Sequence, residues 1–229
     1  MKHQKITAYI DFNGTILNDS RLVCESFDFA FKHFGRSCSF STFQEKYEWP
    51  IETFFLNMGF SQNEAKIHRG TIWEYFHEAY TPFEKKVGLR EGVKATLKAL
   101  RARDGDVVVW SNHTLDSIKQ QCDRLGLTPY VDRYLANKDI TEQKLGRPKA
   151  ERLLRDMAEH GVEKQDTVVV GDSPEEPRVA HAFGLTGIAL TGGFVSDARL
   201  VAARPHYTVS RLLQIPAIVQ KIFGHRGLA

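Results

Sequence analysis

The sequence is poor in cysteine, in long apolar runs and in net charge, and each shortage excludes a class of protein. Only three of the 229 residues are cysteines, at positions 24, 38 and 122, and their spacing matches neither a disulfide framework nor a metal site. No stretch approaches the roughly 20 apolar residues that span a bilayer, and no apolar run of signal-peptide length precedes Asp11. We therefore expect a cytoplasmic protein with reduced thiols and no membrane partner.

The charge balance also argues against one kind of partner. Thirty-one basic and 28 acidic residues leave a formal charge of +3, which is too small to indicate a nucleic-acid partner. The sequence contains, however, 42% hydrophobic residues, which is ample for a buried core. A chain of this length forms one large domain or a domain with a smaller inserted one.

Short apolar runs alternate with helix-like segments along most of the chain. The runs typical of buried strands lie at residues 6–11, 107–110, 134–136, 167–170 and 188–190. Segments with the apolar spacing of helices lie at 91–102, 115–125, 150–160 and 179–183, and the tail adds a strand at 206–209 and a helix from 211 to 223. This alternation predicts an α/β fold, a doubly wound, Rossmann-like parallel sheet.

The region from residue 18 to residue 85 breaks this alternation. Ser20 is predicted to cap a helix whose apolar residues recur every three or four positions. Ser61, with Glu64 three residues on, has the signature of a capping box that opens a longer helix. We therefore predict an all-helical cap domain at 18–85, inserted into an α/β core domain formed by 1–17 and 86–229.

Polar residues suited to phosphate chemistry lie at the ends of three predicted strands. Asp11 ends the first strand, Ser111 and Asn112 follow the run 107–110, and Asp172 follows the run 167–170. Parallel strands bring their carboxyl ends to one edge of a sheet, where open α/β proteins bind ligands. An aspartate is a suitable nucleophile for phosphoryl transfer, and carboxylate oxygens are preferred ligands of Mg²⁺. These residues therefore predict a phosphate site at one edge of the sheet.

Together the motifs resemble those of the haloacid-dehalogenase-like hydrolases, most of which are phosphatases. The Asp-Phe-Asn-Gly-Thr stretch at 11–15 is similar to the family's first motif, Ser111 to its second, and residues 171–176 to its fourth. The resemblance covers nearly the whole chain and is closest to the phosphoglycolate-phosphatase-like branch, which carries a helical cap. It implies a magnesium-dependent enzyme that acts on a small phosphorylated metabolite, as a monomer or a homodimer.

The resemblance also implies a role for each site residue. Asp11 would be the nucleophile and would form an aspartyl-phosphate intermediate. The groups expected to hold the phosphate are those of Gly14, Thr15, Ser111, Asn112 and Arg147. The oxygens expected to hold magnesium belong to Asp11, Asn13, Asp172 and Glu176, with Asn13 contributing its main-chain carbonyl.

The family's third motif, a lysine near the nucleophile, has three candidates here. Arg147, which precedes a proline, fits the usual spacing from Asp172, and Lys149 fits a shorter version of the motif. Lys144 is a more distant candidate. We favour Lys149, because a compact ammonium suits a close carboxylate–phosphate pair better than a forked guanidinium does.

Asn13 departs from the family pattern, which has an aspartate that moves protons at this position. An amide neither gives nor takes a proton at neutral pH, and general acid–base assistance is typically worth about 10²–10⁴-fold. Three possibilities remain for a protein with Asn13. The substrate has a good leaving group, as acyl and aryl phosphates do; another residue, such as His113 or a cap side chain, donates the proton; or the site binds phosphate and magnesium with little turnover. The leading prediction is a phosphatase-like hydrolase, and the alternative is a regulatory protein that binds phosphate and metal.

Two altered chemistries within the family are further alternatives. Its dehalogenases need no magnesium, which disagrees with the acidic pair Asp172 and Glu176. Its phosphonate-cleaving enzymes need a cap lysine that forms an imine, for which Lys46 and Lys66 are available.

Overall fold

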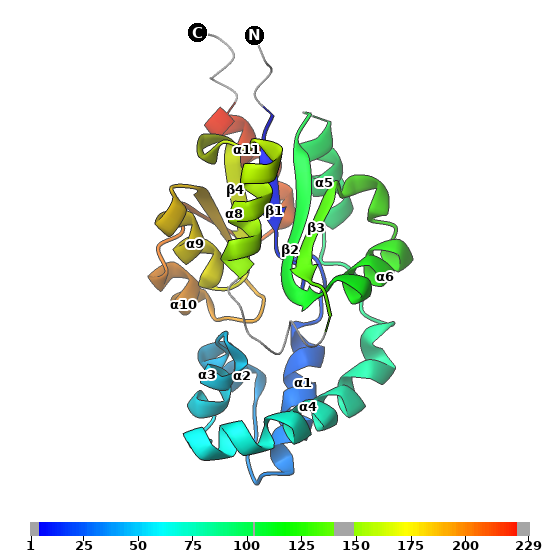
Figure 1. Ribbon diagram of the computed structural model, residues 1–229, viewed down its shortest axis with the longest axis vertical. Helices are drawn as coiled ribbons and strands as arrows, with labels where there is room; N and C mark the ends of the chain where they lie inside the picture. Colours follow the sequence, from blue (N-terminus) through cyan, green and yellow to red (C-terminus); the bar gives the residue numbers. More distant parts are fainter. Residues whose placement is uncertain (1–4, 103, 140–148, 224–229) are drawn as a thin grey trace.

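The computed structural model describes residues 5–102, 104–139 and 149–223, which form an α/β core and a helical cap (Figure 1). Within these residues the core contains a six-stranded sheet of order β3-β2-β1-β4-β5-β6, and all neighbouring strands are parallel. The strands are β1 (Thr7–Ile10), β2 (Asp106–Thr114), β3 (Arg133–Asn137), β4 (Thr167–Gly171), β5 (Thr186–Leu190) and β6 (Tyr207–Val209). The predicted fold class is confirmed.

Helices cover both faces of the sheet, because successive strand residues point to opposite faces and both sets are apolar. Ile10 and Val109 point to the face covered by α5 (Val93–Arg101), α6 (Leu115–Leu125) and α11 (Ile215–Phe223). Tyr9 and Val108 point to the face covered by α8 (Lys149–His160) and α9 (Glu175–Phe183). The sequence did not predict α10 (Asp197–Ala202), since six residues are too few to show a helical period.

The strand order places a crevice at the carboxyl end of β1. The chain adds β2 and β3 on one side of β1 and then crosses to add β4, β5 and β6 on the other side. Connections therefore leave β1 and β4 in opposite directions, which opens the sheet edge for a ligand. Asp11 directly follows β1, and its backbone amide donates to the carbonyl of Val170 on β4 over 2.9 Å.

The cap consists of α1 (Ser20–Lys32), α2 (Phe40–Lys46), α3 (Ile51–Asn57) and α4 (Gln62–Glu84), and it lies beyond the crevice (Figure 1). Its own core is a cluster of aromatic rings that includes Phe27, Phe31, Phe54 and Phe55. The capping box of Ser61 and Glu64 is confirmed, with both reciprocal hydrogen bonds present.

The two chain crossings between core and cap run side by side. Leu17 and Leu89 form an isolated bridge, and the amide of Asn18 donates to the carbonyl of Gly88 over 3.0 Å. We propose that the domain boundaries lie at these two crossings, as expected for a core of 1–17 and 86–229 and a cap of 18–85. No described helix combines the length and the apolar character needed to cross a membrane. The three cysteines are buried and free.

Two local predictions were wrong. Asp19, not Ser20, occupies the N-cap position of α1, and its side chain makes no capping bond because it is used elsewhere. Strand β2 runs on to Thr114, so Ser111 and Asn112 lie within the strand and not after it. A strand does not have to end where its apolar run ends, since pairing with β3 continues it through polar residues.

Candidate active site

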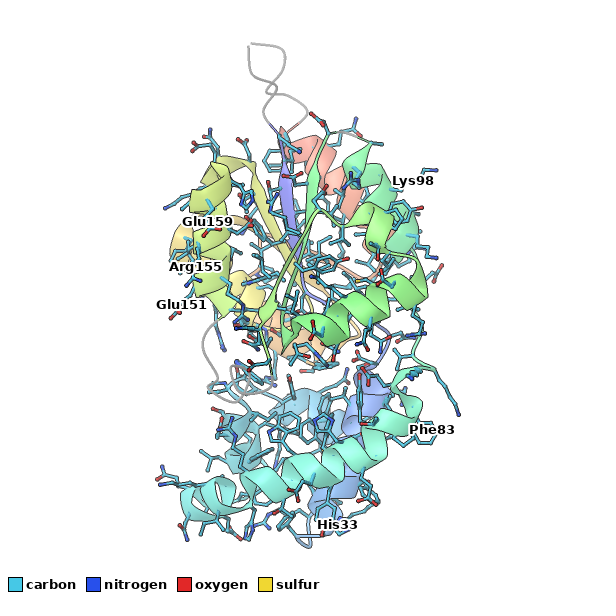
Figure 2. The ribbon with its side chains drawn as sticks, turned by 45° about the vertical axis from the view of Figure 1, so that its right-hand side comes forward. His33, Phe83, Lys98, Glu151, Arg155 and Glu159 are labelled. Atoms are coloured by element: carbon cyan, nitrogen blue, oxygen red, sulfur yellow. The ribbon has the colours of Figure 1, made fainter. Side chains whose placement is uncertain are left out.

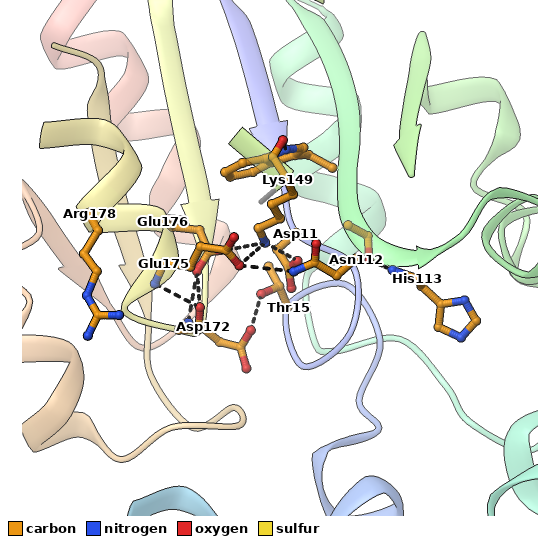
Figure 3. A network of polar contacts seen from close by, with 12 residues as sticks. Asp11, Thr15, Asn112, His113, Lys149, Asp172, Glu175, Glu176 and Arg178 are labelled. Atoms are coloured by element: carbon orange, nitrogen blue, oxygen red, sulfur yellow. Dashed lines mark hydrogen bonds and ion pairs between the residues drawn. The ribbon is translucent and has the colours of Figure 1, made fainter. Parts of the chain in front are cut away.

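Asp11 lies at the centre of a buried network of charges at the carboxyl ends of β1 and β4 (Figure 3). Its carboxylate oxygen Oδ1 is 2.8 Å from Nζ of Lys149. Burial raises the pKa of Asp11 well above its ordinary value, Lys149 opposes this effect, and the negative charges of Glu176 and Asp172 add to it. Asp11 also lines the cavity between core and cap, so its carboxylate can meet a ligand.

Lys149 is the first residue of α8 and is held on all sides. Its ammonium lies over the ring of Trp110, 4.4 Å from the ring centroid, and the Trp110 indole donates to the Lys149 carbonyl over 2.8 Å. Glu176 also accepts from the ammonium, and a Glu175 oxygen lies 3.7 Å away. Burial alone would lower the pKa of Lys149, but the surrounding carboxylates raise it well above its ordinary value, so the ammonium stays charged. The other candidates for this role, Arg147 and Lys144, lie outside the described residues.

Both oxygens of Glu176 are engaged. One accepts from Lys149, and the other accepts from the backbone amide of Ser173 over 3.2 Å and from its hydroxyl over 2.8 Å. Gly171 lies against this carboxyl group, and an added Cβ there would come within 2.2 Å of the Glu176 Cδ. Glu176, predicted as a metal ligand, therefore lies in a fully packed position beside Lys149.

Asp172 is held by the loop after β1 and by the loop after β5. Its Oδ1 accepts from the Thr15 hydroxyl over 2.8 Å, and its Oδ2 accepts from the Phe194 backbone amide over 2.6 Å. Gly14 and Gly193 close around it, since a Cβ on either would approach Oδ2 to 2.2 or 2.0 Å. Burial nevertheless raises the pKa of Asp172 to about 6. The Thr15 hydroxyl, predicted to bind phosphate, is thus directed to a carboxylate in this structure.

Asn13 has a partner that sequence reasoning missed. Its side-chain amide donates to Oδ2 of Asp19 over 2.7 Å, and the backbone amide of Gly14 donates to Oδ1 over 2.7 Å. Asp19 is completely buried, whereas Asn13 lines the cavity. Because an ionised carboxylate only accepts hydrogen bonds, this contact turns the Asn13 amide nitrogen toward Asp19 and leaves its oxygen for other partners. No sequence motif marks the pairing of Asn13 with Asp19, although the two residues are only six positions apart.

The buried Asp19 provides a pH-dependent test of this geometry. Burial raises its pKa to about 7 from the ordinary 3.8, so its contribution to stability is complete below about pH 4 and is lost as pH rises to 7. A shift of this size corresponds to at most about 4 kcal/mol. We expect the melting temperature of Asp19→Asn, relative to wild type, to rise between pH 5 and pH 8 in metal-free buffer. Asp116→Asn, at an exposed position on α6, is the control. A constant difference across this range would contradict the assignment.

The second predicted motif, on β2, contributes polar groups on the opposite side of Asp11 from Asp172 (Figure 3). The Asn112 amide nitrogen donates to Glu175 over 3.2 Å, and the backbone amide of His113 donates to the Ser111 hydroxyl oxygen over 3.1 Å. Nδ1 of His113 accepts from the Thr114 amide over 2.7 Å, so in the neutral ring Nε2 carries the proton. Burial lowers the pKa of His113, which keeps the ring neutral.

Arg90 is a second residue that the sequence did not single out. One guanidinium nitrogen donates to the Gly14 carbonyl over 2.7 Å, and the other donates to the Thr191 carbonyl over 2.6 Å. Arg90 thereby ties the loop after β1 to the loop after β5, the two loops that hold Asp172. No motif in the sequence marks it, because its contacts are to backbone groups.

The charge of the network suits an added cation. Four carboxyl groups converge, those of Asp11, Asp172, Glu175 and Glu176, and Lys149 pairs directly with three of them. No group of three or more His, Cys, Asp or Glu side chains among the described residues is arranged to hold a metal by itself. Two carboxylates and a backbone carbonyl, from Asp11, Asp172 and Asn13, remain a donor set of the oxygen type that Mg²⁺ takes with several waters.

A cavity of about 850 Å³ joins this network to the cap. Its core end is lined by Asp11, Ser111, Lys149 and Asp172, and its cap end is lined mainly by aromatic and aliphatic side chains. Lys46 and Lys66, the candidates for an imine-forming lysine, are exposed and do not line it.

Comparison with known proteins identifies the family. Residues 9–190 match the family described as haloacid dehalogenase-like hydrolase. Because the match spans most of the chain, this protein belongs to the haloacid dehalogenase-like hydrolases. The resemblance inferred from the sequence motifs is confirmed, as is the prediction that the chain is an enzyme of this family.

Several similar proteins match nearly the whole chain at low sequence identity. The "Putative pyrophosphatase PpaX" of Caldanaerobacter subterraneus subsp. tengcongensis is 23% identical over 221 residues, which cover 94% of this chain and 96% of that protein. The haloacid dehalogenase-like family protein SP0104 from Streptococcus pneumoniae superimposes with a TM-score of 0.78 at 17% identity, covering 95% of this chain and 99% of that one. A "predicted phosphoglycolate phosphatase" from Haemophilus somnus 129pt gives a TM-score of 0.71 at 18% identity, covering 96% and 100%. These structures show the shared fold.

Proposed function

We propose that this protein is a magnesium-dependent phosphatase that acts on a small phosphorylated metabolite through an aspartyl-phosphate on Asp11. The observation that carries the proposal is the position of Asp11, 2.8 Å from Lys149 and exposed to a cavity at the carboxyl end of β1. The chain's membership of a hydrolase family, and the names of its relatives as a pyrophosphatase and a phosphoglycolate phosphatase, support a phosphate substrate.

In the proposed reaction an oxygen of Asp11 attacks phosphorus, an O–P bond forms, and the bond to the leaving oxygen breaks. Water then attacks the same phosphorus, the Asp11 O–P bond breaks, and inorganic phosphate leaves. Lys149 neutralises charge on the phosphoryl oxygens and on Asp11, while Glu176 and the Trp110 ring hold it in place. Ser111 binds a phosphoryl oxygen, and Asn112 is held beside it by Glu175.

Magnesium fits the surplus of carboxylates, and we assign its ligands to Asp11, the Asn13 carbonyl and Asp172. When bound, it would supply positive charge to the phosphoryl oxygens. Glu176 is assigned to Lys149 instead, because it is completely buried, bonds to Lys149 and Ser173 and, unlike Asp172, does not line the cavity. Asp19 is proposed to position Asn13, so that its amide oxygen, an acceptor without a proton to give, faces the cavity.

The direct test is phosphate release from 4-nitrophenyl phosphate and acetyl phosphate, with and without magnesium. Turnover that requires magnesium supports the proposal. Asp172→Ala removes one ligand and is expected to abolish magnesium-dependent binding of phosphate, measured by isothermal titration. Glu74→Ala, which changes another cavity-lining carboxylate on the cap, is the matched control. If phosphate and magnesium bind but no ester turns over, the regulatory alternative is favoured. Unchanged phosphate affinity in Asp172→Ala would remove the metal assignment.

A further inference from the structure

We infer that the cavity accepts a phosphate ester whose organic part is a planar aromatic group, and not a second phosphate. This inference rests on the proposed function, because it assumes that a phosphoryl group occupies the end of the cavity near Asp11 and Lys149. The remaining space lies against the cap, and the chemistry of the cap walls decides what can fill it.

The cap walls are built from aromatic rings. Phe27 on α1 and Trp73, Phe76 and Tyr80 on α4 all line the cavity. They brace one another: the rings of Phe27 and Phe76 are 4.5 Å apart, and Trp73 meets Phe76 edge-on at 5.1 Å. Such preorganised walls favour a flat apolar group, because it removes apolar surface from water and stacks without reordering the side chains.

The cations that line the cavity away from Lys149 are already paired. Arg69 on α4 is 2.6 Å from Glu52, and Arg178 on α9 is 3.1 Å from Glu48. Glu48 also pairs with Arg199, over 2.5 Å, and Glu74 is a further carboxylate that lines the cavity. A second phosphate would have to compete with carboxylates for these guanidinium groups and would be repelled by Glu74, so pyrophosphate and bisphosphates are disfavoured.

The chemistry at Asn13 leads independently to the same class of substrate. Asn13 cannot protonate the leaving oxygen, so the leaving group has to be stable as an anion. A phenol ionises near pH 10, as tyrosine does, whereas water ionises only near 15.7. An aryl phosphate therefore needs far less acid catalysis than an alkyl phosphate, and its ring matches the aromatic walls.

The test measures binding of non-hydrolysable analogues to the full-length protein by isothermal titration in magnesium. The probes are phenylphosphonate, methylphosphonate and methylenediphosphonate. Phenylphosphonate is expected to bind at least about tenfold more tightly than each of the other two, because only its ring is buried against the cap. Turnover of phenyl phosphate and pyrophosphate is measured separately on the same sample.

Two variants on the same helix locate the effect. Trp73→Ala is expected to remove the preference for phenylphosphonate. Tyr75→Ala is expected to keep it, because Tyr75 does not line the cavity. Its ring stacks on His33 at 3.7 Å, and His33 lies on the side of the cap far from the core (Figure 2). If Trp73→Ala does not fold, the wild-type ranking of the three probes decides alone.

The outcomes separate this inference from the proposed function. Phosphatase activity without a preference for phenylphosphonate would overturn the aromatic assignment and leave the function intact. Tight phenylphosphonate binding without turnover would support the aromatic cavity and overturn the function. Tighter binding of methylenediphosphonate, or no binding of any probe, would overturn the inference.

Discussion

Asp11→Asn is expected to reduce turnover of every phosphate ester to background, a loss of at least about 10⁴-fold. An amide oxygen is a poor nucleophile and cannot form the aspartyl-phosphate, so no other group replaces this step. At the same time the variant removes one of the three carboxylates that surround the Lys149 ammonium. We therefore expect its melting temperature to equal or exceed that of wild type.

Mass spectrometry provides the direct measurement. Wild-type protein treated with acetyl phosphate and then with borohydride is expected to carry the label at Asp11 alone. Asp116→Asn, on the exposed start of α6, should react and turn over like wild type. Label on another carboxylate, or full activity in Asp11→Asn, would remove Asp11 from its proposed role.

The second large effect concerns Asn13 and its partner Asp19. Replacing Asn13 by aspartate alone restores the family's proton-carrying group, but it sets a second carboxylate 2.7 Å from the first. Two carboxylates at this distance share one proton, and their titrations are coupled. Asp19 already has a pKa raised to about 7 by burial. The single variant is therefore expected to bind that proton between the two side chains and to lose stability above neutral pH.

The exchange variant, Asn13→Asp with Asp19→Asn, keeps one amide and one carboxylate in the pair. In this variant the side-chain amide nitrogen at position 19 donates to the new carboxylate at position 13. The amide oxygen at position 19 accepts from the Gly14 backbone amide, which donates to Asp19 in the wild-type protein. We expect this variant to raise turnover of alkyl phosphates by about 10²–10⁴-fold over wild type, and the single Asn13→Asp variant to raise it less. Aryl and acyl phosphates should gain much less, because their leaving groups need little protonation.

Steady-state kinetics on glycerol phosphate, phenyl phosphate and acetyl phosphate measure this difference. A neutral or harmful exchange would mean that the protein already uses another proton donor, and Tyr47 and His113, which both line the cavity, are the residues to test next. No activity in any form would favour the regulatory alternative. Asn followed by Gly deamidates readily, so peptide mapping of residue 13 must precede the wild-type measurement.

Local apolar patterns and the expectation of a parallel sheet were sufficient to bring several of the predicted polar residues to one sheet edge. Asp11, Ser111 and Asp172 lie at one edge of a parallel sheet because each is placed at or near the end of an apolar strand, and parallel strands end on the same side. Lys149 was preferred to Arg147 because an ammonium is more compact than a guanidinium. In the structure its ammonium lies 2.8 Å from Asp11. The helical cap and its capping box followed from apolar periodicity and from the pair Ser61 and Glu64.

The sequence by itself therefore determined the family, the α/β fold, the helical insert and the strands at or near whose ends the polar residues lie, because all of these depend on local spacing. Only the tertiary structure decided which polar groups pair. It directed Asp19 away from its helix cap to Asn13, engaged Glu176 with Lys149 and Ser173, and tied Gly14 to Thr191 through Arg90. These pairings depend on how buried and partly buried polar groups from distant segments satisfy one another's hydrogen bonds, and residue spacing does not record which partners are chosen.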